Sequence, residues 1–264
     1  MATPTPGQAS PADDPLPEAT ALARGAAEQG LGLKLLGGLA VRVLCPGFPP
    51  RLRAGQDMDF ACLSKGRKNV VAYLESSGCA PDRRFNNLNG DRQMYFNAPS
   101  GRPIDVMVDR LTMCHTLDLR PSFGNLPLTI DAVDVLLSKL QIVELNEKDA
   151  RDLLHLLGGV PVGTADSGGA GAGGGAVIDR GRFAKLLGSD WGWWRTVTGS
   201  LAKLPALAAE HPQLLPPDPP LDPLAQARVL QDLAESAPKS MKWKLRANVG
   251  DRVRWYELPE EVGH

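Results

Sequence analysis

The sequence predicts an α/β fold, with a small mixed sheet, flanking helices and a C-terminal helical extension. Two observations predict it. In the first 158 residues, short apolar segments of strand length alternate with segments whose apolar residues recur at helical spacing. A stretch of Gly, Ala and Ser follows over residues 163–176, and the segments after it have mainly helical patterns. We therefore expect an α/β domain first and a helical part after a flexible linker.

The chain divides into four predicted parts. Its 264 residues are enough for one large domain with an appendage. Residues 1–18 have almost nothing to bury and are predicted to form a disordered tail. The α/β domain is expected over residues 19–158, the Gly-rich linker over 159–176, and the helical extension with its basic tail over 177–264.

The composition excludes several classes of protein. A formal net charge of −1 excludes a globally basic nucleic-acid binder, although a local basic patch stays open. No apolar run approaches the roughly 20 residues that span a bilayer, and the first residues lack the basic and apolar regions of a signal peptide. The four cysteines, Cys45, Cys62, Cys79 and Cys114, show no CxxC pairing, so we expect reduced thiols in a cytoplasmic protein.

The first elements are predicted to alternate between helix and strand. The helices follow from helix-forming composition, or from apolar residues three to four positions apart, as at Val70 and Leu74. The strands follow from apolar runs too short for a helix. In chain order we predict a helix over 19–29, a strand over 34–36, a turn at Gly37 and Gly38, a helix over 39–44, a strand over 57–63 and a helix over 69–77.

A hairpin is predicted in the middle of the chain. Residues 93–97 and 102–109 flank the turn 98–101, whose sequence is APSG. Residues 83–88 are predicted to be a further strand, which the turn signal at 89–91 ends. Asp105 therefore lies on a strand of the hairpin.

The later elements are predicted to be helical until the tail. Asp131 is a plausible N-cap for the first of these helices. The predicted helices cover 132–143, 147–157, 182–187, 193–204 and 224–235. In the tail, basic and apolar residues alternate over 241–246 and 252–256, which predicts two strands of a hairpin.

Acidic residues occur at two places on the predicted strands. Asp57 and Asp59 are two positions apart, so on a strand they share one face. If the strand that carries Asp105 lies beside them, three carboxylates converge. Such a cluster repels itself unless cations fill it, and oxygen ligands favour magnesium or manganese. Two such ions can hold a nucleoside triphosphate and activate an oxygen nucleophile.

The Gly37 and Gly38 pair lies between a predicted strand and a predicted helix. Backbone amides at a helix N-terminus bind phosphate, and glycine lets a ligand approach closely. Taken alone, a glycine pair is more often a simple turn, and an acidic pair is usually solvated. The glycine pair, Asp57 with Asp59, and Asp105 are far more specific together than any one of them.

The order of these motifs carries a resemblance. Gly-Gly, then Asp-x-Asp, then an apolar-Asp-apolar strand resembles the nucleotidyltransferase superfamily that includes DNA polymerase beta. The finer likeness is to its minimal AbiEii-like type, because the segment 36–42 (LGGLAVR) looks like that group's first motif and Arg53, four residues before Asp57, also fits. Two residues before Asp57, the group often has Thr or Ser, whereas this sequence has Gly55. This departure removes a hydroxyl contact to phosphate. The resemblance covers residues 32–157.

The resemblance implies a role for each matching residue. Asp57, Asp59 and Asp105 would be the catalytic carboxylates that hold Mg²⁺ or Mn²⁺, and Asp105 would also take the proton of the acceptor hydroxyl. The residues that would contact the nucleoside triphosphate are Gly37, Gly38, Arg53 and Lys139.

The function that the resemblance implies is transfer of a nucleoside monophosphate from a nucleoside triphosphate such as ATP to an acceptor hydroxyl, with release of pyrophosphate. The acceptor would be RNA, a protein or a small molecule. Some members of the group are toxins of toxin–antitoxin systems, so a cognate antitoxin protein is a further implied partner. The alternative is a non-catalytic nucleotide- or nucleic-acid-binding protein built on the same fold.

Two segments of the C-terminal part admit two interpretations each. The aromatic cluster 191–195 (WGWWR) suits base stacking, but such clusters more often anchor the core of a small helical subdomain. The basic residues of the tail, over 239–254, could touch an RNA acceptor or could form a solvated edge that prevents aggregation.

Overall fold

The computed structural model describes residues 14–50, 55–124, 126–165 and 175–258. Its contacts group the chain into two compact units. The first unit contains residues 1–110 and 127–130, and the second contains residues 111–126 and 131–264. Each unit is described by itself.

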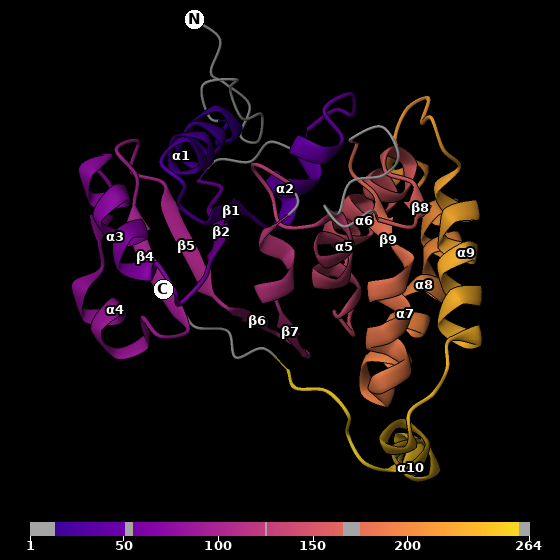
Figure 1. Cartoon of the computed structure of the whole chain (residues 1–264). Helices are drawn as coiled ribbons and strands as arrows, with labels where there is room; N and C mark the ends of the chain where they lie inside the picture. Colours follow the sequence, from indigo (N-terminus) through magenta and orange to yellow (C-terminus); the bar gives the residue numbers. More distant parts are fainter. Residues whose placement is uncertain (1–13, 51–54, 125, 166–174, 259–264) are drawn as a thin grey trace, which may run out of the picture. The chain divides into compact units, whose positions relative to one another are not determined.

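The first unit is built on a five-stranded mixed sheet (Figure 1). Strand β2 pairs in parallel with β5, whereas the pairs β1–β2, β4–β5 and β3–β4 are antiparallel. This arrangement confirms the predicted α/β class with a small mixed sheet. In sheet order the strands are β1 (Leu33–Leu35), β2 (Met58–Cys62), β5 (Pro103–Val108), β4 (Gln93–Asn97) and β3 (Ala80–Pro81).

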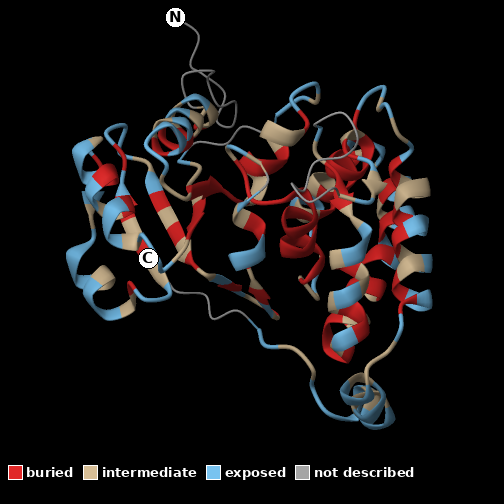
Figure 2. Cartoon of the chain, viewed as in Figure 1, coloured by how far each residue is buried: buried red, intermediate tan, exposed pale blue. Residues whose placement is uncertain are grey.

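In the described part of this unit, four α-helices accompany the sheet. The strands alternate between a buried and a less buried face. Ile104, Val106 and Val108 of β5 are buried, so Asp105, which lies between two of them, points to the other face. Figure 2 shows this alternation along the strands. The helices are α1 (Leu16–Glu28), α2 (Gly37–Leu44), α3 (Arg67–Ser76) and α4 (Arg83–Asn89).

Two predictions for the first unit are wrong. The segment predicted as a strand over 83–88 is the helix α4, because the Asp82 side chain caps it by accepting a hydrogen bond from the Phe85 N–H at 2.9 Å. The predicted tail extends too far, because its last three residues form the first turn of α1, with Pro17 at a position that tolerates proline. Residues 1–13 lie outside the described part.

The second unit is mainly helical. Helix α5 (Ala132–Leu140) is buried along its whole length (Figure 2), and α6, α7 and α8 pack against it. Short strands accompany them: β6 (Arg110–Thr112), which starts at the last residue of the first unit, β7 (Thr116–Asp118), β8 (Val162–Gly163) and β9 (Ile178–Asp179). The α-helices are α5 (Ala132–Leu140), α6 (Glu147–Gly159), α7 (Arg180–Ser189), α8 (Trp191–Glu210), α9 (Pro223–Ser236) and α10 (Met241–Val249). The 3₁₀ helices are η2 (Arg120–Phe123), η3 (Pro212–Leu214) and η4 (Gly250–Arg252).

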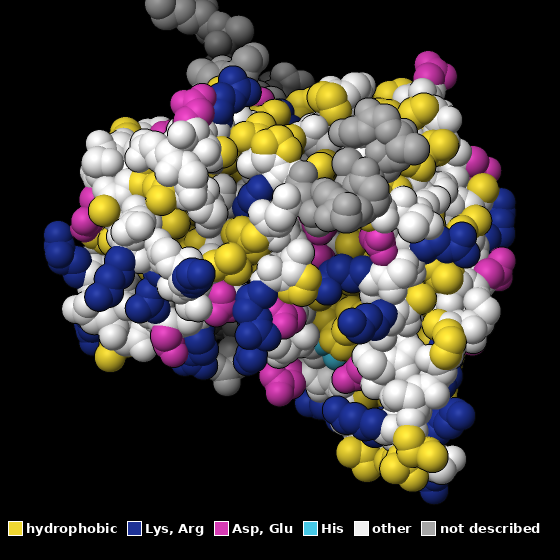
Figure 3. Space-filling model, in the orientation of Figure 1, with side chains coloured by type: hydrophobic (Ala, Val, Ile, Leu, Met, Phe, Trp, Pro, Cys, Tyr) yellow, Lys and Arg dark blue, Asp and Glu magenta, His cyan; other side chains and the backbone are white. Residues whose placement is uncertain are grey.

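The predicted helices of this unit are confirmed, but the predicted hairpin in the tail is wrong. Residues 241–249 form the helix α10, whose first turn is capped by Ser240, since the Ser240 Oγ accepts a hydrogen bond from the Trp243 N–H at 3.1 Å. Met241 and Leu245 lie four residues apart, which is a helical spacing, and they are 73% and 64% exposed. Figure 3 shows hydrophobic and basic side chains together on this part of the surface.

The predicted linker is only partly outside regular structure. Gly159 is the last residue of α6, and Val162–Gly163 form β8, which pairs in parallel with β9. Residues 166–174 lie outside the described part. The contacts also place α5 and α6 in the second unit rather than with the sheet. The domain boundary at Gly158 therefore stays a prediction, because the contacts divide the chain at other residues.

The cysteines and the helices bear on two further expectations. All four cysteines are free thiols with buried side chains. Within the described residues, the helices are too short or too polar to cross a membrane.

Candidate active site

The register of the sheet places Asp59 directly beside Asp105. Parallel pairing of β2 with β5 opposes these two residues, and antiparallel pairing of β4 with β5 opposes Tyr95 to Asp105. Opposed side chains on neighbouring strands share a face, so Asp59, Asp105 and Tyr95 form one row across the sheet. Asp57 immediately precedes β2, two residues before Asp59. The juxtaposition that the strands were expected to create is therefore present for Asp59 and Asp105.

Asp105 is held by two side chains of β4. The Gln93 Nε2 donates hydrogen bonds to both carboxylate oxygens, at 3.0 and 2.8 Å, and lies 3.3 Å from the Tyr95 hydroxyl. Burial raises the pKa of Asp105 to about 7, and the negative charges of Asp59 and Asp57 add to that rise, while the hydrogen bonds from Gln93 and Tyr95 oppose it. This carboxyl group therefore exchanges its proton near neutral pH.

Tyr95 responds to the same environment. Burial raises its pKa to about 12, and the charges of Asp105, Asp57 and Asp59 contribute in the same direction. The three carboxylates therefore lie within electrostatic range of one hydroxyl group, which stays protonated at neutral pH.

Gly37 brings the start of α2 against Asp59. Its φ of +64° lies in the left-handed region, and a Cβ added to it would lie 2.6 Å from the Asp59 Oδ2. The backbone of Leu36, the residue before Gly37, is held against the backbone of Asp59, because the Leu36 N–H donates a hydrogen bond to the Asp59 carbonyl oxygen at 3.0 Å. Only glycine meets both conditions without strain or collision. The helix start therefore lies in contact with one of the predicted metal-binding carboxylates.

The start of α2 can bind an anion. Leu36 at the N-cap gives the helix no side-chain hydrogen bond, so the first N–H groups of the helix are not capped in that way. Uncapped N–H groups and the helix dipole favour phosphate at such a position. The glycine pair and the carboxylates thus place an anion-binding element next to groups that attract a cation.

The carboxylate oxygens are suitable ligands for a divalent cation, but their arrangement does not enclose one. Oxygen donors are what Mg²⁺ and Mn²⁺ prefer. Among the described residues, however, no three His, Cys, Asp or Glu side chains are grouped closely enough to hold one ion. The chemistry of the donor set fits, with Asp57, Asp59 and Asp105 as the residues that would hold the ion.

Lys139 lies in the second unit and has acidic partners there. Its Nζ is 2.9 Å from the Asp149 Oδ1 and 2.9 Å from the Asp152 Oδ2, and the residue is 8% exposed. Burial alone would lower the pKa of Lys139, but the carboxylates of Asp152 and Asp149 outweigh it and raise the pKa above its ordinary value. The predicted contact of Lys139 with phosphate stays a prediction, and in this structure its charge is already paired.

Arg53 and Gly55 precede Asp57 in the predicted site. Arg53 lies outside the described residues. Gly55 has a φ of +66°, and a Cβ added to it would meet nothing within 4 Å. The departure from Thr or Ser at this position therefore removes a hydroxyl and leaves open space.

The sequence interpretation missed Gln93 and Tyr95. A signal for both was available, because the hairpin with its turn over 98–101 sets the register that opposes Tyr95 to Asp105. Gln93 is two residues before Tyr95 and therefore shares its face.

Comparisons with known proteins were made by sequence and by structure. The sequence matches no model of a protein family, and it matches no curated protein. Among solved structures, the chain is similar to the antibiotic-resistance factor ANT(2'')-Ia, with a TM-score of 0.36 and 13% identity, over 53% of this chain and 80% of that one. It is also similar to a candidate nucleotidyltransferase from H. pylori, with a TM-score of 0.38 and 12% identity, over 91% of this chain and 99% of that one. A third similar structure is an antigenic nucleotidyltransferase-like protein from Paracoccidioides brasiliensis, with a TM-score of 0.38 and 13% identity, over 86% of this chain and 95% of that one.

Proposed function

We propose that this chain is a magnesium-dependent nucleotidyltransferase, which transfers a nucleoside monophosphate from a nucleoside triphosphate to an acceptor hydroxyl. The observation that carries the proposal is the contact of Gly37 with the Asp59 carboxylate, next to Asp105 in the same row. A triphosphate bound with a divalent cation needs a turn that binds its phosphates. It also needs carboxylates close enough to that turn to contact the cation on the same triphosphate. The turn at Gly37 beside Asp59, with Asp105 on the neighbouring strand, supports this arrangement.

Each residue has a defined part in the proposed reaction. Gly37 and Gly38 would contact the triphosphate through the backbone, and Asp57, Asp59 and Asp105 would hold the cation, which would supply neutralisation of the charge on the phosphates. The acceptor oxygen forms a bond to the α-phosphorus while the bond to the pyrophosphate oxygen breaks. The hydroxyl proton passes to Asp105, which lies beside Asp59 on the neighbouring strand.

Labelled nucleotides test the proposal. Each nucleoside triphosphate, labelled at either the α- or the γ-phosphate, is incubated with the protein, Mg²⁺ and total cellular RNA. Transfer of the α-label without the γ-label is expected, because pyrophosphate carries the γ-phosphate away. Asp59→Asn should lower the rate by at least about a hundredfold, since it removes a charge needed in the transition state.

Asp109→Asn is the matched control. Asp109 is also an acidic residue of the first unit, and its Oδ1 accepts a hydrogen bond from the Ser64 N–H at 2.9 Å. Asparagine can accept the same bond and tolerates the left-handed φ of +60° at this position. Equal loss of transfer in both variants, or transfer of the γ-label, would overturn the proposal.

A non-catalytic nucleotide-binding protein is the second candidate, and one observation favours it. Both oxygens of Asp105 already accept hydrogen bonds from Gln93, which competes with a cation for the same oxygens. Magnesium-dependent binding of a nucleoside triphosphate without transfer to any acceptor would support this function over the first.

The finer assignments belong to the same proposal. We place the chain with the minimal AbiEii-like type on the motifs in 36–42 and at Asp57, Asp59 and Asp105. The nature of the acceptor decides whether the chain acts as a toxin on RNA, with an antitoxin protein as partner, or modifies a protein or a small molecule. The product that receives the α-label distinguishes these acceptors.

A further inference from the structure

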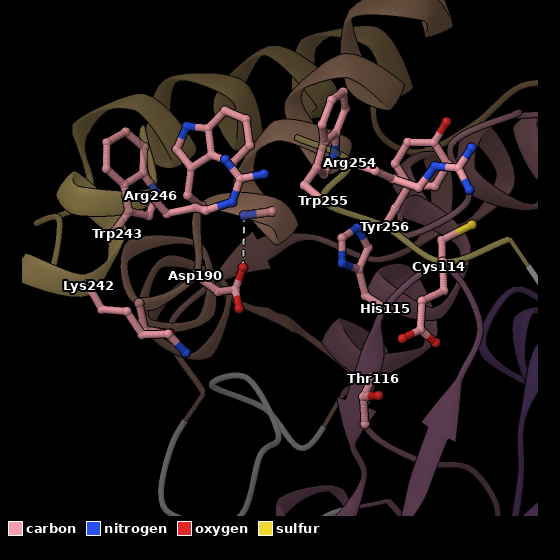
Figure 4. Close-up of a pocket in the computed structure, with 14 residues that line it drawn as sticks. Cys114, His115, Thr116, Asp190, Lys242, Trp243, Arg246, Arg254, Trp255 and Tyr256 are labelled. Atoms are coloured by element: carbon pink, nitrogen blue, oxygen red, sulfur yellow. Dashed lines mark hydrogen bonds between the residues drawn. The ribbon is translucent and has the colours of Figure 1, made fainter. Parts of the chain in front are cut away.

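The second unit contains a pocket of about 470 Å³ that the proposed transfer reaction does not use. Three parts of the unit line it: the segment 114–116 between β6 and β7, the start of α8, and α10 with the residues that follow it (Figure 4). A volume of this size is typical of sites for small organic ligands.

Aromatic rings form much of the wall of the pocket. Trp191 and Trp255 pack edge to face with ring centroids 5.7 Å apart, and Trp255 packs against Tyr256 in the same way at 5.3 Å. Trp243 lines the pocket from α10. Trp191 is 5% exposed, so the core interpretation of the aromatic cluster is correct for this residue, although its ring also borders the pocket. The wall therefore offers planar apolar surfaces to a ligand.

Three basic side chains border the pocket, and two of them, Lys242 and Arg254, are exposed. Arg246 is committed to the structure: its guanidinium lies 4.5 Å from the Trp191 ring centroid and donates a hydrogen bond to the Gly250 carbonyl oxygen at 2.8 Å. Lys242 and Arg254 are exposed, and Arg254 stacks on the Tyr256 ring at 5.6 Å. These two cations are available to an anion.

The remaining polar groups of the pocket include two acidic residues, which offset part of this positive charge. Asp190 caps α8, because its Oδ1 accepts hydrogen bonds from the Gly192 and Trp193 N–H groups at 2.8 and 3.1 Å. Glu257 is the other acidic residue of the lining. Burial lowers the pKa of His115 to about 4, so its ring is neutral at pH 7.

Hydrogen bonds hold the Trp255 and His115 rings of the pocket in place. The Trp255 Nε1 donates a hydrogen bond to the Thr196 Oγ1 at 3.0 Å, and the same oxygen lies 2.8 Å from the His115 Nε2. Among the described residues, no group accepts a hydrogen bond from the buried Trp243 Nε1.

We propose that this pocket binds an unpaired nucleotide, with its base stacked on the aromatic wall and its phosphate at Lys242 and Arg254. Bases stack on indole and phenol rings with little dependence on base identity, and each phosphate is an anion that Lys and Arg contact. The inference goes beyond the proposed transfer activity and does not depend on it. A free nucleotide and one residue of a single strand share this chemistry.

The test is binding of a fluorescein-labelled single-stranded RNA of six uridines to the full chain, followed by anisotropy. EDTA is present, and no triphosphate is added, so the site in the first unit does not contribute through a cation. The variant Lys242→Ala/Arg254→Ala removes the two cations of the pocket. The matched variant Lys244→Ala/Arg252→Ala removes the same charge from exposed residues of the same region that do not line the pocket.

The expected result is a loss of affinity of at least about tenfold in Lys242→Ala/Arg254→Ala, and less than about threefold in the matched variant. The salt dependence should also fall, by a slope of about 0.7 for the one lost phosphate contact with a single strand. Equal losses in the two variants, or no binding by the unaltered protein at millimolar concentration, would overturn the proposal.

Competition by AMP identifies the source of the nucleotide. Displacement of the RNA at similar concentrations of AMP supports a free nucleotide, and displacement only by unlabelled RNA supports a single strand; either result supports the proposal if the variants behave as expected. Asp59→Asn should bind the RNA as the unaltered protein does. In this variant, transfer tests the proposed function and RNA binding tests the pocket. The two proposals can therefore fail independently of each other.

Discussion

At the scale of single residues, Gly37 shows how a local backbone requirement serves the proposed site. Its positive φ could be met by glycine in any turn, but the collision of a Cβ with the Asp59 Oδ2 at 2.6 Å is specific to this place. The sequence indicated Gly37 only as half of a common glycine pair. The contact with Asp59 depends on how β1, β2 and α2 pack, which no short motif states.

Gly37→Ala separates these two requirements. Strain from the positive φ should cost about 1 kcal/mol of stability, and the collision should displace Asp59 and lower transfer by at least about tenfold. Gly30→Ala is the control, because Gly30 has a φ of +70° and a Cβ there would meet nothing within 4 Å. Thermal melts and α-label transfer measure both variants. Equal activity in both would contradict the role of the contact.

Asp105 gives a prediction about pH. Its pKa is about 7 in the folded protein, against 3.8 when unperturbed, so between these values the folded chain holds a proton that the unfolded chain has lost. Stability should therefore fall as the pH rises from about 4 to about 7, and the full penalty applies above pH 7.

Asp105→Asn removes that penalty. At pH 8 the variant should be more stable than the unaltered protein, by at most about 4 kcal/mol, and at pH 3.5 the two should be nearly equal. Denaturant unfolding at both pH values measures the difference. A stability difference that does not change with pH would show that Asp105 has an ordinary pKa.

At the scale of elements, Lys139 joins α5 to α6. Its ammonium group lies between Asp149 and Asp152 of α6, and all three side chains are largely buried. A cation that satisfies two buried carboxylates is costly to remove, because both are then left unpaired.

Lys139→Ala should therefore lower the free energy of unfolding by about 3–5 kcal/mol. Lys148→Ala is the control: Lys148 is an exposed residue of α6, and its loss should change stability by less than about 0.5 kcal/mol. Denaturant unfolding compares them. A small effect of Lys139→Ala would mean that the cation is free to serve a phosphate instead.

The elements also show which parts of the fold the sequence could predict. The hairpin of β4 and β5 and most helices follow from local patterns, and they were found within a few residues of their ends. The strand expected over 83–88 became α4 because a single capping residue, Asp82, outweighed a weak apolar pattern. The tail became α10 for a similar reason, since Ser240 caps it and the alternation over 241–246 is also compatible with a helix.

At the scale of the whole molecule, the sequence could not show how the elements group. It divided the chain at the Gly-rich stretch predicted to be a linker, whereas the contacts assign α5 and α6 to the same unit as the C-terminal helices. That grouping depends on long-range packing, such as the ion pair between Asp134 of α5 and Arg182 of α7, with 2.7 Å between the Asp134 Oδ1 and the Arg182 Nη2. No local spacing predicts such a pair.

The candidate site was more predictable than this grouping. Residues on neighbouring strands meet once the register is known, and the order of the motifs placed Asp59 and Asp105 correctly beside each other. The pocket of the second unit was not predicted, because it needs α10 to be a helix and the residues after it to lie beside the segment 114–116.

The measurement that tests the central claim most directly is the affinity for a nucleoside triphosphate with and without Mg²⁺, because it needs no knowledge of the acceptor. Calorimetry should show binding at least about tenfold tighter with Mg²⁺ than with EDTA. That gain should disappear in Asp59→Asn and persist in Asp109→Asn. Two results would contradict the claim that Asp57, Asp59 and Asp105 beside Gly37 form a site for a metal-bound triphosphate. One is that the unaltered protein binds no triphosphate, and the other is that Asp59→Asn keeps the full gain from Mg²⁺.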